Sequence, residues 1–249
     1  MAKRVRSSCR TRGTCSPWQD LASAPGVVKL LGALLLSPLL AALSAPLPLS
    51  AQELDSGHLY LREEGRRVGT ERFRVWRTGS TVNAVASVER VQRAAWQVRL
   101  QMDPRLLPVK YEIREGVSAL VSGERFPDRI RFHFATPEGE RWKDYPVQDA
   151  AAILEPGVAH HYLVLVQALR QAPDGRMKAI LPLEGRSVTV RLADRTGQRV
   201  SLGEEPVDAT RYDMDIEGAR HRVWLDADDR LLRVLDAGGR EALRAPAGG

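Results

Sequence analysis

Few side chains in this sequence have the types and spacing that metal binding requires. The five histidines are His58, His133, His160, His161 and His221. His160 and His161 are adjacent, so on a helix they project roughly 100° apart and share no ligand-binding face. A zinc site needs several such ligands close together, and here they would have to come from distant segments. We therefore interpret the pair as a helix end or a loop, and we predict no metal site and no cofactor.

A second candidate is the acidic run of Asp226, Asp228 and Asp229, which suggests a calcium loop. The run lacks the glycine and the distal glutamate that an EF-hand loop requires. Aspartate also favours turns, because its side chain hydrogen-bonds to nearby backbone amides. We therefore predict that this run is a turn between two strands.

Motifs for covalent or nucleotide chemistry are absent from the sequence. It has no G-x-S-x-G nucleophile elbow, and no phosphate-binding loop, dinucleotide-binding glycine motif or H-E-x-x-H pair. Two carboxylates from different strands could still meet and act on a glycosidic bond. We predict a protein without enzymatic activity and keep a hydrolase of an envelope polymer as an alternative.

The N-terminal region has the order of segments found in a secretory signal peptide. A basic stretch precedes the apolar run 27–45, and residues 49–51 form a cleavage site before Gln52. The competing interpretation is a membrane anchor, but Pro38 interrupts the run, which is short for a span of ~20 residues. We predict a signal peptide over residues 1–51, cleavage after Ala51, and a periplasmic or secreted protein that does not span a membrane.

Removal of residues 1–51 changes the charge and cysteine content of the chain. This segment holds six of the 37 basic residues and one of the 31 acidic ones, which leaves 31 and 30 in the other 198 residues. A nucleic-acid-binding protein needs a basic surface, so we predict no nucleic-acid partner. Cys9 and Cys15 are the two cysteines, so the mature chain has no disulfide. The long basic region suggests that residues 1–26 reflect a translation start placed too early.

After residue 57 the apolar residues recur with a period of two. This alternation is found in the runs 96–102, 109–114, 129–134, 188–192 and 211–216. It is typical of antiparallel strands with one buried face, and glycine and aspartate turns separate the runs. We predict one all-β domain over residues 52–244, a curved antiparallel sheet that forms a half-barrel or barrel. The tail 245–249 is predicted to be disordered.

Two segments add detail to this plan. In residues 157–171 the apolar positions Val158, Tyr162, Leu165 and Leu169 have helical spacing, which predicts one short helix, placed most simply against one opening of the sheet. The charged stretch 57–76 is predicted to be the opening hairpin, with its charges on the solvent face.

The apolar face of the sheet is the best candidate for a binding surface. Six large residues are predicted to lie on it: Trp96, Tyr111, Phe132, Phe134, Tyr212 and Met214. One interpretation is a closed core. The other is the concave wall of an incomplete barrel that holds an acyl chain or another apolar ligand, since ligand cavities are lined mostly by such side chains.

Three stretches resemble an uncharacterised family of secreted bacterial β-rich proteins, known as domains of unknown function. They are G-x-L-x-L-x-x-x-G-x-x-V-G-x-E-x-F-x-V at 57–75, Y-E-I-R at 111–114, and R-Y-D-M with V-W-L-D-A-D-D-R-L-L-R-V at 211–234. The strand plan is also similar to the half-barrels of lipoprotein carriers (LolA-type), which wrap a lipid in a curved sheet closed by helices. This resemblance implies a role in handling lipids.

We therefore expect an exported protein that binds a lipid or another apolar molecule in its curved sheet. One alternative is a structural or protein-interaction module of the cell envelope, with a closed core and an exposed strand edge. The other is the envelope-polymer hydrolase. Co-purified lipid would favour the first interpretation, and partner-dependent stability the second.

Overall fold

The computed structural model describes residues 51–136, 139–147, 151–203 and 205–246. All of these belong to one compact unit of the chain, Leu47–Gly249. The predicted signal peptide, apart from Ala51, and residues 247–249 of the predicted tail lie outside the described residues. No helix within the described residues is long and apolar enough to cross a membrane.

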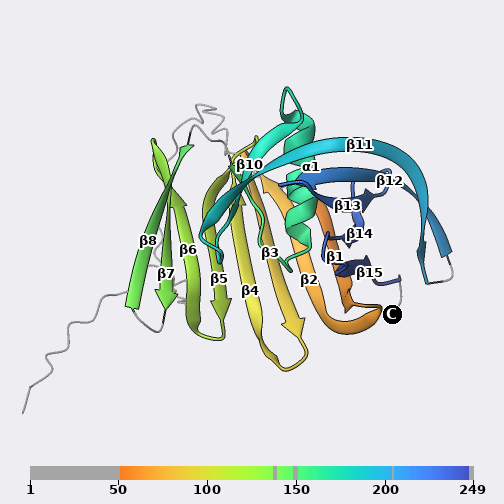
Figure 1. Cartoon of the computed structure of the whole chain (residues 1–249), viewed down its shortest axis with the longest axis horizontal. Coiled ribbons are helices and arrows are strands. Elements are labelled where there is room, and N and C mark those ends of the chain that lie inside the picture. The colour runs from red at the N-terminus through yellow and green to blue at the C-terminus, as the bar shows by residue number, and fades with distance from the viewer. Residues whose placement is uncertain (1–50, 137–138, 148–150, 204, 247–249) are drawn as a thin grey trace, which may run out of the picture. The chain divides into compact units, whose positions relative to one another are not determined.

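The first half of the sheet, β1–β8, is a meander in which each strand pairs antiparallel with the next (Figure 1). Its strands are β1 (Gln52–Glu63), β2 (Arg66–Thr78), β3 (Thr81–Arg90), β4 (Arg93–Met102), β5 (Pro108–Glu115), β6 (Ser118–Arg125), β7 (Arg129–Thr136) and β8 (Gly139–Pro146). Tight turns with glycine at positive φ join several of these strands, as at Gly65, Gly79 and Gly116.

The second half of the chain forms strands β9–β15 and the one helix of the described residues, α1, which lies between β9 and β10 in sequence. The elements are β9 (Ala151–Ile153), α1 (His160–Gln171), β10 (Arg176–Leu181), β11 (Arg186–Leu202), β12 (Glu205–Ile216), β13 (Ala219–Leu225), β14 (Leu231–Leu235) and β15 (Glu241–Arg244). Strands β9 and β10 are parallel, with α1 as their connection, whereas β10–β15 form an antiparallel meander.

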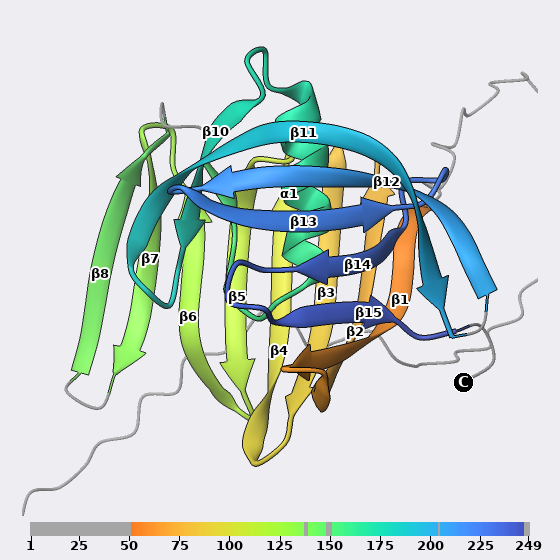
Figure 2. The ribbon, with the colours of Figure 1, turned by 45° about the vertical axis from the view of Figure 1, so that its right-hand side comes forward.

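The two halves form one sheet of 15 strands because β1 pairs antiparallel with β15. The sheet does not close: β8 and β9 stand at its two ends. The halves curve around α1, which lies between them (Figure 2). The structure thus confirms an all-β fold with a curved, predominantly antiparallel sheet and one helix.

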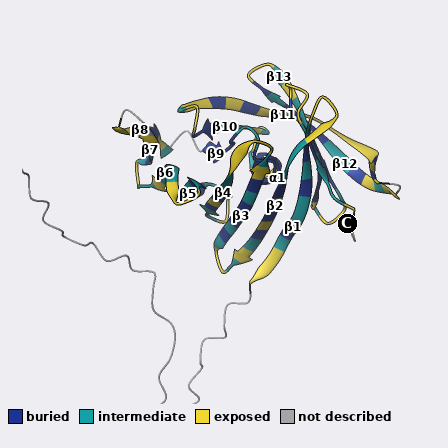
Figure 3. Cartoon of the chain, turned by 90° about the horizontal axis from the view of Figure 1, so that it is seen from below, coloured by how far each residue is buried: buried dark blue, intermediate teal, exposed yellow. Residues whose placement is uncertain are grey.

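The alternation of apolar and polar residues in the sequence corresponds to side chains that point alternately into the core and away from it. In β3, Val82, Ala84, Ala86 and Val88 are buried and alternate with residues that are more exposed. The inward rows of both halves and seven apolar residues of α1 form one hydrophobic core, and Figure 3 shows the buried positions gathered around the helix. Burial of this apolar surface is the main stabilising contribution to such a fold.

The helix begins at His160 rather than at residue 157, and it fills the inside of the curve rather than covering an opening. Its side chains explain this position. Only Gln167, Arg170 and Gln171 of its 12 residues are not buried, and a helix that is apolar on nearly all sides is stable only inside a core.

Candidate ligand-binding site

The six residues predicted to line a cavity all belong to the core around α1. Tyr111, Phe132, Tyr212 and Met214 are buried, with at most 3% of their surface exposed, and Trp96 and Phe134 are half-buried against the same core. The concave face is therefore occupied by the protein's own helix. A role of these six side chains in contact with a ligand stays a prediction.

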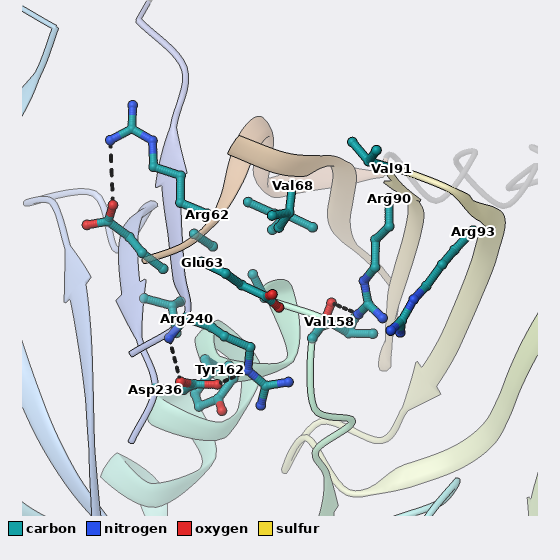
Figure 4. Close-up of a pocket in the computed structure, with 16 residues that line it drawn as sticks. Arg62, Glu63, Val68, Arg90, Val91, Arg93, Val158, Tyr162, Asp236 and Arg240 are labelled. Atoms are coloured by element: carbon teal, nitrogen blue, oxygen red, sulfur yellow. Dashed lines mark hydrogen bonds and ion pairs between the residues drawn. The ribbon is translucent and has the colours of Figure 1, made fainter. Parts of the chain in front are cut away.

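A cavity with an apolar inner wall and charged groups lies at the end of the wrapped sheet where α1 begins. Its volume is about 320 Å³, at the lower end of the range for small-molecule sites. Figure 4 shows the residues around it. The lining residues are Leu61, Arg62, Glu63, Val68, Arg90, Val91, Arg93, Gly157, Val158, Ala159, Tyr162, Val234, Asp236, Arg240, Glu241 and Ala242.

These residues meet because several chain segments end at this opening. They come from the end of β1, the start of β2, the turn between β3 and β4, the first turn of α1, and the hairpin between β14 and β15. The pairing of β1 with β15 brings the two ends of the domain together here. The inner wall is apolar, since Leu61, Val158, Val234 and Ala242 are buried.

A buried carboxylate holds the inner wall in place. Glu71 of β2 is fully buried and accepts hydrogen bonds from the backbone amides of Ala159 (2.6 Å) and His160 (2.9 Å) and from Nδ1 of His160 (2.8 Å). No side chain of α1 itself caps the helix. Glu71 therefore supplies the cap from the sheet, where a negative charge is stabilised by the helix N-terminus.

Glu71 also corrects the prediction for the opening hairpin. Its charges were expected on the solvent face, but Glu71 faces the core, directly across from Leu59 in the register of β1 and β2. The sequence does contain the signal for this, because Glu71 is in phase with the buried Phe73 and Val75 of the same strand. A carboxylate on the apolar face of a strand indicates a buried partner.

The histidine pair opens α1, and both side chains are fully buried. His161 Nδ1 accepts a hydrogen bond from the backbone amide of Glu155 (3.1 Å), so its proton is on Nε2. Burial places the pKa of His161 well below 6.5, and the imidazole is neutral. A group of three or more His, Cys, Asp or Glu side chains arranged to hold a metal is not found in the described part of the chain.

Glu155 begins the segment that leads into the helix, residues 155–159. Its carboxylate accepts a hydrogen bond from the amide of Leu183 (3.0 Å), and its side chain is buried. Burial raises the pKa of Glu155 from 4.5 to about 7. The segment is thus fixed at both ends, by Glu155 and by Glu71, and its Gly157–Ala159 portion forms one wall of the cavity.

Four arginines surround the cavity together with three carboxylates. Asp236 accepts hydrogen bonds from Nε (2.6 Å) and from the backbone amide (2.9 Å) of Arg240. Arg62 lies 3.6 Å from Glu241. Arg90 and Arg93 project toward the cavity from the turn between β3 and β4 (Figure 4). The rim is therefore mixed in charge, with one more cation than anions.

Arg90 links the rim to the inner wall. It donates a hydrogen bond to the carbonyl of Gly157 (2.9 Å), and its guanidinium lies 4.7 Å from the ring centroid of Trp96. Burial, together with the charges of Arg93 and Arg240, lowers the pKa of Arg90. Trp96, Arg90 and Arg93 also border a neighbouring recess of about 310 Å³. Of the six predicted binding residues, Trp96 is the one that borders this recess.

The acidic run at residues 226–229 forms the predicted turn. One carboxylate oxygen of Asp226 accepts hydrogen bonds from the amides of Asp228 (2.9 Å) and Arg230 (2.8 Å). These bonds close the connection between β13 and β14. Turn geometry therefore explains Asp226, whereas Asp228 and Asp229 pair with Arg230 and Arg170.

Comparison with known proteins adds no relative to this description. No family model, no curated protein and no solved structure matches the chain. The resemblance to secreted domains of unknown function and to lipoprotein carriers consequently rests on hairpin motifs and strand plan alone.

Proposed function

We propose that this protein is exported and binds a lipid-like, partly apolar molecule in the cavity at the N-terminus of α1, without catalysing a reaction. The observation that carries the proposal is the cavity itself: a pocket of about 320 Å³ with a buried apolar inner wall and a charged rim. Ligand sites combine these two features, since the apolar wall supplies affinity and a few polar groups fix orientation.

The position of α1 supports a site at the opening of the sheet. The helix occupies the concave face that would hold the lipid in a half-barrel carrier. The proposed cavity lies beside the first turn of the helix, against Val158 and Ala159, where Leu61 and Ala242 continue the apolar wall. The proposed ligand therefore enters the opening of the sheet and does not pass through its centre.

Val91 and Val117 provide a matched test of this location. Both are exposed valines in hairpin turns, with 65% and 89% of their surface exposed, but Val91 lines the cavity and Val117 does not. We expect binding of a neutral naphthylamine fluorophore to weaken about tenfold in Val91→Asp, because a carboxylate replaces apolar contact at the mouth. The Val117→Asp variant is expected to bind as the wild type does. Equal binding by both variants would contradict this location.

A second candidate function is a protein-interaction module, which the end strand β8 favours. Trp142 of β8 is 62% exposed, and its ring lies 4.3 Å from that of His133, centroid to centroid. Exposed tryptophans are typical of interface hot spots. Capture of a specific envelope protein that Trp142→Ser abolishes, with no effect on fluorophore binding, would support this candidate.

A further inference from the structure

We infer that the ligand of this cavity carries an anionic group, a carboxylate or a phosphate, at one end of an apolar chain, and that Arg93 binds that group. This inference rests on the proposed function and adds the chemical class of the ligand. It follows from the ion pairs of the rim, from the position of Arg93 and from the apolar depth of the cavity.

Arg93 is the cation of the rim that is open to a ligand. Within the described residues its side chain has no hydrogen-bond or ion-pair partner, and it is exposed at the first position of β4. Arg90 beside it donates to a neutral carbonyl, that of Gly157. Two guanidinium groups therefore stand together without a bound carboxylate. A guanidinium offers a planar pair of donors that matches a carboxylate or phosphate.

Two of the three rim carboxylates are already engaged. Asp236 is bound to Arg240, and Glu241 lies 2.6 Å from Arg233, which is outside the cavity, and 3.6 Å from Arg62. Glu63 is the third, exposed and without an ion-pair partner within the described residues. Within the described residues, Arg93 and Arg90 thus keep positive charge at the rim that no carboxylate binds. The exposed Glu63 opposes an incoming anion, as do the buried Glu71 and, in the neighbouring recess, Glu115.

The helix N-terminus does not supply the anion site. The amides of Ala159 and His160 already donate to Glu71, so they are not available to a ligand, unlike the guanidinium groups of Arg90 and Arg93. The buried wall of Leu61, Val158 and Ala242 lies below them. A simple anion would leave this wall in contact with water, whereas a chain with an anionic end satisfies both parts of the cavity.

The test compares three ligands by isothermal titration calorimetry at low ionic strength: decanoate, decanol and acetate. Decanoate and decanol share the chain and differ in charge, and acetate has the charge without the chain. We expect decanoate to bind about tenfold more tightly than decanol, as a hydrogen bond to a charged group allows, and acetate to show no binding. Added salt is expected to reduce the preference for decanoate.

Three variants assign the preference to the rim. Arg93→Gln is expected to remove most of the preference for decanoate, whereas Glu63→Gln is expected to increase it about threefold, because exposed charge pairs have small effects. Arg99→Gln is the control, since Arg99 is an exposed arginine of the same strand that does not line the cavity. It is expected to leave the preference unchanged.

The outcomes separate the two claims. Equal binding of decanoate and decanol would overturn the anionic class and leave the proposed function standing. Binding of neither would overturn both. Acetate binding as tightly as decanoate would overturn the amphipathic ligand, and an unchanged preference in Arg93→Gln would overturn the assignment to Arg93.

Discussion

Replacing Glu71 by alanine should destabilise the protein severely. Its carboxylate accepts three hydrogen bonds inside the core, two from backbone amides at the start of α1 and one from His160. In Glu71→Ala these donors lose their acceptor in a region that water does not reach. The helix cap and the anchor of the cavity wall are lost together.

The magnitude follows from the burial of these groups. Each buried donor left without a partner costs about 1–3 kcal/mol, with the higher values when the lost acceptor carried a charge, and three donors lose their acceptor here. Because these contributions overlap, we expect the free energy of unfolding to fall by about 3–5 kcal/mol. Single domains are typically stable by roughly 5–15 kcal/mol, so the variant should be close to unfolding at 37 °C.

Urea denaturation followed by tryptophan fluorescence measures this change. Glu71→Gln keeps the shape and one acceptor oxygen, so it should lose less stability than Glu71→Ala. Glu89→Ala is the control, because Glu89 is an exposed glutamate on the neighbouring strand β3, and it should remain within about 0.5 kcal/mol of the wild type. A loss below 1 kcal/mol in Glu71→Ala would refute the role of Glu71 as the cap of α1.

Two further predictions concern the segment that leads into the helix. Burial raises the pKa of Glu155 from 4.5 to about 7. Its contribution to the free energy of unfolding is therefore present below pH 4.5 and declines as pH rises toward 7, by at most about 3 kcal/mol. In urea denaturation across this range, Glu155→Gln should lack that decline, and identical pH profiles of variant and wild type would contradict this prediction. Gly157 has φ +86°, and an added Cβ would lie 1.9 Å from Nη2 of Arg90, whereas at Gly185 (φ +61°) it would meet nothing within 4 Å. In both glycine-to-alanine variants the free energy of unfolding, measured by urea denaturation, should fall by about 1–2 kcal/mol. Only Gly157→Ala should weaken ligand binding measured by calorimetry. Equal binding by both variants would argue against Arg90 as part of the rim.

The architecture was predictable from the sequence because it depends on local patterns. Alternation in runs such as 96–102 and 211–216 predicted antiparallel strands, and the helical spacing within 157–171 predicted one helix. The position of α1 inside the curve was missed, although its nearly continuous apolar surface indicates complete burial. The parallel pair β9–β10 was missed as well, since β9 is only three residues long.

The cavity was not predictable because its residues are distant in sequence. Arg62, Arg90 and Arg240 come together only through the pairing of β1 with β15 and the curvature of the sheet. Alternation assigns each of them to a strand end or a turn, where arginine is unremarkable. Glu71 was the one residue of the site with a local signal, a carboxylate in phase with apolar neighbours.

Both proposals require that this protein carries a ligand in the cavity beside α1. Native mass spectrometry of the protein, purified from an exporting host without detergent, tests it most directly. We expect a stoichiometric added mass that organic extraction releases as an anionic lipid, and that Val91→Asp reduces while Val117→Asp does not. A mass equal to that of the polypeptide alone, with no binding of decanoate or of the naphthylamine fluorophore, would contradict it.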